Sequence, residues 1–276
     1  TMSVERFGIR RMLPENVRLI SGPGCPVCVT PKNYIDKAIG LTGLEDVIIF
    51  SFGDMLKVPG THSSLLKKKS SGKVKIVYSA LDAVEFAEKS QDKKIVFLGI
   101  GFETTVPTVA ASIKYAKKKK LKNFFVYSGH KVMPPAMRLL AGDKEVNIKG
   151  FLCPAHVSAI IGTMPYSIIS KKYNIPCVIS GFEPLDILQS ILMLVRQVKL
   201  NIAKVENQYN RVVRVSGNTK ALNLIDEVFS THDSEWRGIG VIKKSGLVLS
   251  RRYSDFDAEK YIDFPKVETK MDKGCI

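Results

Sequence analysis

The sequence predicts an α/β protein in which two related, doubly wound parallel-sheet domains face a shared cleft, with a hairpin in the C-terminal part. The main observation is that short apolar, β-rich runs alternate with helical stretches along most of the chain, which is typical of βαβ units. A second is that Gly-Phe-Glu follows an apolar run at 101–103 and again at 181–183, each time where a helix is expected to begin. This repetition suggests that two halves of the chain are related.

The expected elements follow from this alternation in chain order. In the first part, strands and helices are expected at Val17–Ser21 (strand), Pro31–Leu41 (helix), Val47–Phe52 (strand), Val74–Tyr78 (strand) and Leu81–Lys89 (helix). The second part continues the alternation at Ile95–Ile100, Thr104–Lys118, Phe124–Tyr127, Pro135–Ala141, Gly150–Leu152, His156–Gly162, Ser167–Tyr173, Cys177–Ser180 and Leu185–Val198. Buried strands of this kind form parallel sheets whose two faces are covered by helices.

The end of the chain has a different pattern. Arg237–Val241 and Gly246–Ser250 flank residues 242–245, and together they predict a hairpin. We expect soft domain boundaries near Asp92 and Asn207. They divide the chain into a first α/β domain at 1–92, a second at 93–206 and a C-terminal part at 207–276.

Composition excludes several classes of protein. With 45% hydrophobic and 25% charged residues, the chain has enough apolar surface to fold, which excludes a disordered chain. No apolar run is long enough to span a membrane, and no secretory signal is present, so a cytoplasmic location is expected. The net charge of +16 includes lysine runs at 67–69 and 117–120, but both occur where helices should end and lack interleaved aromatic residues. A solvated surface is therefore favoured over a nucleic-acid interface.

The clearest chemical motif is Cys25-Pro26-Val27-Cys28 within the glycine- and proline-rich segment 21–31. It lies between an expected strand and an expected helix, with Thr30 as N-cap and Pro31 as the first helical residue. The positive end of a helix favours the thiolate form of nearby cysteines. Five cysteines without an export signal are too few for a disulfide scaffold. We therefore expect a redox or metal-binding pair at Cys25 and Cys28.

The two Gly-Phe-Glu segments place carboxylates at expected helix starts. Glu103 could take part in hydrogen bonding or proton transfer in the cleft, or could simply favour the helix dipole, and Glu183 mirrors it. The first segment lacks the spacing of a dinucleotide-binding or P-loop motif. His130 and Lys131 lie in a strand-to-helix loop, where a surface position is slightly favoured over a place in the cleft.

His156 has two interpretations. It could carry protons in the cleft, or it could join Cys25, Cys28 and Cys153 in a zinc site, which we consider less favoured. Cys177 lies in an apolar run and is expected to be a buried, inert thiol.

Taken together, these segments resemble the HypD family of hydrogenase maturation proteins. The resemblance rests on residues 6–10 (Arg-Phe-Gly-Ile-Arg), 22–31 (Gly-Pro-Gly-Cys-Pro-Val-Cys-Val-Thr-Pro), 101–105 (Gly-Phe-Glu-Thr-Thr), 154–158 (Pro-Ala-His-Val-Ser) and 180–184 (Ser-Gly-Phe-Glu-Pro). These motifs occur in the family's order and extend over nearly the whole chain.

The resemblance implies a cytoplasmic scaffold that assembles the Fe(CN)2CO unit of NiFe-hydrogenase. It implies a HypC-type chaperone and a HypE-type cyanide donor as partners. Cys25 and Cys28 would hold the iron or cycle between dithiol and disulfide, while Glu103, His156 and Glu183 match motif positions that line the cleft. Such a protein is an assembly scaffold that could carry thiol redox chemistry rather than an enzyme with a turnover assay.

The chain departs from the family pattern at both ends. A Cys-Gly-Gly-His segment is expected ahead of Thr1, and a cysteine-rich tail that binds a 4Fe-4S cluster is expected beyond Cys275. We therefore expect an incomplete copy, truncated before that tail, in which Cys275 is the one candidate cluster residue and no stable cluster is retained. The alternatives are a general CxxC thiol-disulfide oxidoreductase, the zinc module named above and a nucleic-acid binder driven by charge.

Overall fold

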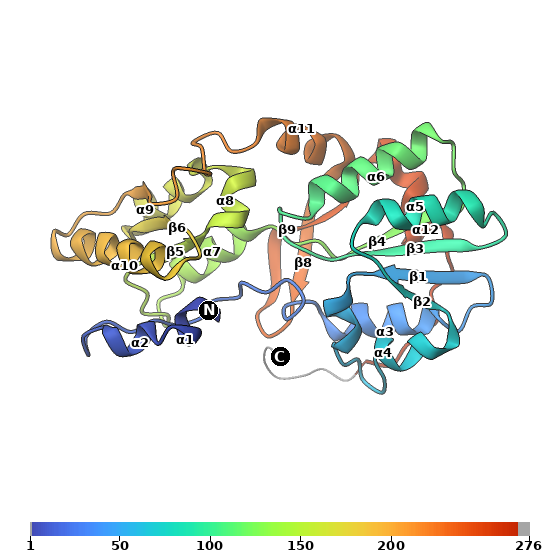
Figure 1. Ribbon diagram of the computed structural model, residues 1–276, viewed down its shortest axis with the longest axis horizontal. Helices are drawn as coiled ribbons and strands as arrows, with labels where there is room; N and C mark the ends of the chain where they lie inside the picture. Colours follow the sequence, from blue (N-terminus) through green and yellow to red (C-terminus); the bar gives the residue numbers. More distant parts are fainter. Residues whose placement is uncertain (1, 270–276) are drawn as a thin grey trace. The chain divides into compact units, whose positions relative to one another are not determined.

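The computed structural model describes residues 2–269, which divide into two compact units. The four-stranded unit comprises residues 25–132 and 223–269, and the three-stranded unit comprises residues 2–24 and 133–222. Both contain a parallel sheet with helices packed against it, so the expected α/β class is confirmed (Figure 1). The chain passes between the units near Gly24, near Val132 and within helix α11 (Thr219–Val228).

This division differs from the boundaries expected near Asp92 and Asn207. Strands from both sides of Asp92 pair in one sheet, because β1 (Val47–Ser51) bonds to β3 (Lys94–Gly99). The segment after Asn207 is shared between the two units. Hydrogen bonding between strands that are distant in sequence therefore determines the units, and composition along the chain does not reveal it.

The sheet of the four-stranded unit has the order β2-β1-β3-β4, with all neighbours parallel. Strand β2 is Val74–Ile76 and β4 is Phe124–Ser128. The chain moves outward from β1 in one direction and then returns to the other side, which is a doubly wound order. In such sheets the loops at the carboxyl ends of the strands gather at one edge, where ligands commonly bind.

Alternate side chains of these strands pack on opposite faces of the sheet. Ile49, Val96 and Tyr127 share a core with α3 (Lys32–Leu41), while Phe50 on the other face packs against Phe86 of α5 (Ala80–Lys89) at 5.2 Å between ring centroids. The remaining helices of the unit are α4 (Leu65–Lys68), α6 (Val106–Lys118) and α12 (Ala258–Tyr261). Both faces of the sheet are therefore covered, as the apolar runs predicted.

An antiparallel hairpin completes the four-stranded unit. It consists of β8 (Phe229–Trp236) and β9 (Gly240–Leu249). The expected hairpin is confirmed, but the expected turn at 242–245 is wrong, because these residues lie within β9. The chain turns between Trp236 and Gly240, where Gly238 and Gly240 have φ values of +78° and +100° that other residues rarely adopt.

The three-stranded unit has the parallel order β5-β6-β7. Its strands are β5 (Phe151–Pro154), β6 (Cys177–Ser180) and β7 (Val205–Asn207). Its helices are α1 (Met2–Arg6), α2 (Ile9–Met12), α7 (Met133–Gly142), α8 (Ala155–Ile161), α9 (Ser167–Tyr173) and α10 (Pro184–Lys199). Strand β7 was not expected from the sequence.

The strand expected at Val17–Ser21 is wrong. Residues 17–21 form no strand, and Val17 and Leu19 instead pack against a small core that includes Ile187 and Ile191 of α10. Their alternating apolar pattern is therefore explained by contact with a helix rather than by pairing in a sheet. As a result, the Cys-x-x-Cys segment does not follow a strand.

Asn123, at the start of β4, ties this strand to the end of α5. Its side-chain amide donates to the carbonyls of Ala87, Ser90 and Lys93 at 2.9–3.1 Å, and the residue is buried. We predict that Asn123→Ala lowers the free energy of unfolding by about 1–3 kcal/mol, since it leaves these carbonyls without their donor. The neighbouring exposed Lys122→Ala should change it by less than about 0.5 kcal/mol. Equal unfolding midpoints in urea for both variants would contradict this.

Candidate functional site

Cys25 and Cys28 lie in one tight turn directly ahead of α3. Cys25 is exposed and Cys28 is half-buried. The backbone N–H of Cys28 donates to Cys25 Sγ at 3.2 Å, and the N–H of Val29 donates to the Cys25 carbonyl at 3.2 Å. Both thiols are therefore held by a single hydrogen-bonded turn, and at least one of them can be reached from solvent.

The start of α3 differs in detail from the expectation. Thr30 is not the N-cap, because its hydroxyl donates to the Pro26 carbonyl at 2.8 Å and so closes the cysteine turn instead. Pro31 is the N-cap, and its carbonyl accepts the N–H groups of Tyr34 and Ile35. Proline suits this position because it has no N–H of its own to satisfy.

The hairpin anchors this turn. The N–H of Arg237, which directly follows β8, donates to the carbonyl of Val29 at 2.8 Å. The adjacent Trp236 is fully buried, its indole N–H donates to Ser245 Oγ at 2.8 Å, and its ring stacks on Phe102 with centroids 5.8 Å apart. The cysteine turn and the first Gly-Phe-Glu loop are therefore both supported by residues 236–237.

The first Gly-Phe-Glu loop connects β3 to α6, as expected. Gly101 is required here, since a Cβ at this position would lie 1.8 Å from Thr105 Oγ1. Phe102 and Glu103 are both buried. Glu103 is therefore a buried carboxyl group in the loop that packs on Trp236, which is a more constrained position than a helix start alone would require.

The second Gly-Phe-Glu loop, in the three-stranded unit, connects β6 to α10. Strands β5 and β6 end side by side, with Pro154 opposite Ser180. This brings the exposed ring of His156 onto Phe182, with centroids 4.0 Å apart. Glu183 is the N-cap of α10, and its carboxylate is largely exposed. The structure thus brings His156 and Glu183 to the same edge of one sheet.

Sequence reasoning missed a polar cluster next to these residues. Asp186, in the first turn of α10, accepts two hydrogen bonds from Arg211 at 2.9 and 2.7 Å and one from Gln208 at 2.8 Å. Arg211 also lies 3.7 Å from Glu183 and stacks over Tyr209. The hydrogen bonds from Arg211 lower the pKa of Asp186 despite its burial. Asp186 could have been found from the sequence, because an acidic residue in the first turn of a helix is a recognisable pattern. Nothing in the sequence indicated that Arg211 is its partner.

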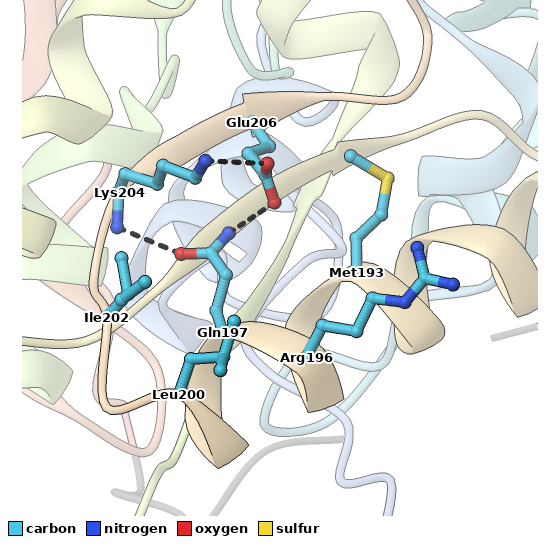
Figure 2. A pocket seen from close by; sticks show the side chains of 7 residues that line it. All are labelled: Met193, Arg196, Gln197, Leu200, Ile202, Lys204 and Glu206. Carbon is cyan, nitrogen blue, oxygen red and sulfur yellow. Dashed lines mark hydrogen bonds and ion pairs between the residues drawn. The ribbon is translucent and has the colours of Figure 1, made fainter.

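A surface hollow of this unit belongs to its scaffold. It measures about 200 Å³ and lies between the end of α10 and the edge strand β7 (Figure 2). Gln197 donates to Glu206 at 2.7 Å and accepts from the N–H of Lys204 at 2.9 Å, while Lys204 Nζ lies 3.2 Å from Glu206. These polar groups bind each other and hold β7 against α10, which positions Gln208 and Arg211.

The other two described cysteines lie in the three-stranded unit. Cys153 and Cys177 are buried in β5 and β6, and burial raises the pKa of Cys153 well above its usual range. Cys177 is buried as expected. Within residues 2–269, no group of three or more His, Cys, Asp or Glu side chains is placed to hold a metal ion. Cys25 and Cys28 lie in the four-stranded unit and Cys153 and His156 in the three-stranded unit, so the zinc site that would join them stays a prediction. Cys275 lies outside the described residues.

Comparison with known proteins identifies the relatives of this chain. The HypD family model, described as "Hydrogenase formation hypA family", matches residues 1–276. The hydrogenase maturation factor HypD2 of Bradyrhizobium diazoefficiens is 45% identical over 284 residues, covering 100% of this chain and 75% of the relative. The hydrogenase maturation factor HypD of Escherichia coli is 45% identical over 263 residues, covering 95% of this chain and 70% of the relative.

The chain belongs to the HypD family. The resemblance inferred from the motifs is thereby confirmed over the whole chain. Within this HypD-family chain, the five motif residues divide between the units. Cys25, Cys28 and Glu103 lie in the four-stranded unit, and His156 and Glu183 lie in the three-stranded unit.

The Asp186–Arg211 pair generates a prediction with a defined pH dependence. The pKa of Asp186 is lower in the folded chain than the unfolded value of about 3.9, so the pair stabilises the fold above that pH and this contribution is lost as the pH falls through the folded pKa. We predict that Arg211→Met lowers the free energy of unfolding at pH 7, because it removes two hydrogen bonds to the Asp186 carboxylate. The exposed Arg214→Met serves as control and should have little effect.

The measurement is thermal or urea unfolding of the parent chain and both variants at pH 7 and pH 3. The deficit of Arg211→Met should shrink at pH 3. An equal deficit at both pH values would show that the arginine acts only through packing.

Proposed function

We propose that this chain acts in hydrogenase maturation by holding iron at the thiolates of Cys25 and Cys28 while the Fe(CN)2CO unit is assembled. The observation that carries the proposal is the cysteine pair itself, held in one turn with Cys25 exposed, in a chain of the HypD family. Thiolates are soft, electron-rich ligands and suit iron that must bind further ligands. Two cysteines leave coordination positions open for them.

The remaining motif residues are assigned supporting roles. Glu103 is buried in the loop that packs against the anchor of the cysteine turn, which suits a carboxyl group that orients or protonates a ligand near that turn. The exposed imidazole of His156 and the carboxylate of Glu183 suit proton transfer at the edge of their sheet.

We further propose that this chain works with a HypC-type chaperone and that a HypE-type protein supplies cyanide. A cytoplasmic location suits the free thiols. No helix within residues 2–269 is long and apolar enough to cross a membrane. No stable 4Fe-4S cluster is expected on this chain, and the role of Cys275 as a cluster ligand stays a prediction. Iron and acid-labile sulfide near four per chain after anaerobic reconstitution would contradict this expectation.

The experiment is an anaerobic pull-down with a HypC-type chaperone, followed by metal analysis of the complex. We predict that the parent complex retains iron and that Cys25→Ala and Cys28→Ala each lose most of it, since each removes one of two ligands. Cys177→Ala is the matched control, because Cys177 is buried in β6. Iron retained equally by all four chains would contradict the proposal.

The second candidate is a general thiol-disulfide oxidoreductase, which the exposure of Cys25 favours. In that reaction the Cys25 and Cys28 thiols would form a disulfide while the substrate disulfide is reduced to two thiols. Reduction of insulin by the iron-free chain, together with a chaperone complex that holds no iron, would favour this candidate.

A further inference from the structure

A cavity of the four-stranded unit lies at the carboxyl end of β4, between the start of α3 and the hairpin. It has a volume of about 170 Å³ and contains no cysteine. Its walls include Tyr34, Tyr127, His130, Lys131, His232 and Ser234. His130 and Lys131 were expected at the surface, and this expectation is wrong, because their exposures are 1% and 3%. Strand β9 covers the loop, with the N–H of Leu247 donating to the His130 carbonyl.

Lys131 is a buried cation that has no counter-ion among the described residues. Its ammonium donates to Ser234 Oγ at 2.5 Å, and among residues 2–269 no carboxylate lies within ion-pairing distance of it. An ammonium group has three donors, so Ser234 leaves two for another partner. Burial lowers the pKa of Lys131 to about 8, and the charge of Glu235 partly opposes this effect. A buried, unpaired charge is costly, which favours an anion in the adjoining cavity.

Among the histidines near this cavity, none replaces Lys131 as the cation that would pair with an anion. His130 Nε2 is buried without a hydrogen-bond partner among the described residues, and burial with the nearby lysine lowers the pKa of His130 to about 3, so this ring is neutral. The pKa of His232 is also lowered, first by burial and then by Lys131. The cavity therefore offers one cation, a neutral polar ring nitrogen and the N-terminal end of α3, which favours anions.

The rim and the walls restrict the size and charge of the ligand. Asp233 and Glu235 are exposed at the rim, and Asp233 accepts the N–H of Lys244 at 2.9 Å. Their charges disfavour an anion that carries two charges. Tyr34 and Tyr127 stack with centroids 4.1 Å apart and give the cavity an apolar wall. At about 30 Å³ per water, the volume corresponds to a ligand of a few non-hydrogen atoms.

We propose that this cavity is a binding site for a small monocarboxylate, whose carboxylate pairs with Lys131 Nζ and whose short apolar end contacts the Tyr34–Tyr127 pair. The site is separate from the cysteine turn and does not depend on iron there. It gives the buried lysine the counter-ion that residues 2–269 do not supply.

The test is calorimetric titration of the full chain at pH 7 with acetate, propionate and inorganic phosphate at equal ionic strength. We expect saturable binding of both carboxylates and binding of phosphate that is weaker by about tenfold or more. Lys131→Met should weaken carboxylate binding by about tenfold or more, because it removes the charge but keeps the length of the side chain. Lys243→Met, on the exposed face of β9, is the matched control and should bind as the parent does.

Amide NMR shifts of the parent chain provide a second readout that needs no variant. Propionate should shift the signals of Lys131 and Ser234 while leaving those of the cysteine turn in place. The proposal is overturned if the parent shows no saturable carboxylate binding, if phosphate binds as tightly, if Lys131→Met binds as the parent does, or if the shifts map elsewhere.

Discussion

The hydrogen bond from the Arg237 N–H to the Val29 carbonyl is the contact on which the candidate iron site depends. It joins the cysteine turn to a hairpin that is more than 200 residues away in sequence. The neighbouring Trp236 packs on Phe102 and thereby fixes the loop that carries Glu103. Together with the packing of Val27 on the core, this connection holds Cys25 and Cys28 in place relative to the sheet of their unit.

The two units use the ends of their strands in the same way but place different chemistry there. In the four-stranded unit, the loops after β3 and β4 carry a buried carboxyl group and a buried lysine. In the three-stranded unit, the loops after β5 and β6 carry an exposed histidine and an exposed carboxylate, beside the pair of Asp186 and Arg211. Both arrangements follow from parallel strands, whose carboxyl ends lie at one edge.

Much of the fold could be predicted from the sequence, because buried parallel strands produce a clear local pattern of apolar residues. Apolar runs predicted β3, β4 and β6 closely, and the repeated Gly-Phe-Glu marked two strand-to-helix loops. The strand prediction at Val17–Ser21 was wrong because an alternating apolar pattern indicates one buried face. The pattern does not indicate whether a helix or a strand covers that face. The prediction that His130 and Lys131 are exposed was wrong, although polar residues in a loop usually are. The hairpin that buries them comes about 100 residues later in the chain. Arg211 could not be assigned, since its partner is 25 residues away.

The central claim is that the thiolates of Cys25 and Cys28 bind iron together. X-ray absorption at the iron K-edge, measured on the anaerobic chain loaded with one equivalent of ferrous iron, tests this claim most directly. The account predicts two sulfur ligands in the parent chain and the loss of one in each of Cys25→Ser and Cys28→Ser. A coordination shell of oxygen and nitrogen alone, or sulfur ligation that survives in both variants, would contradict it.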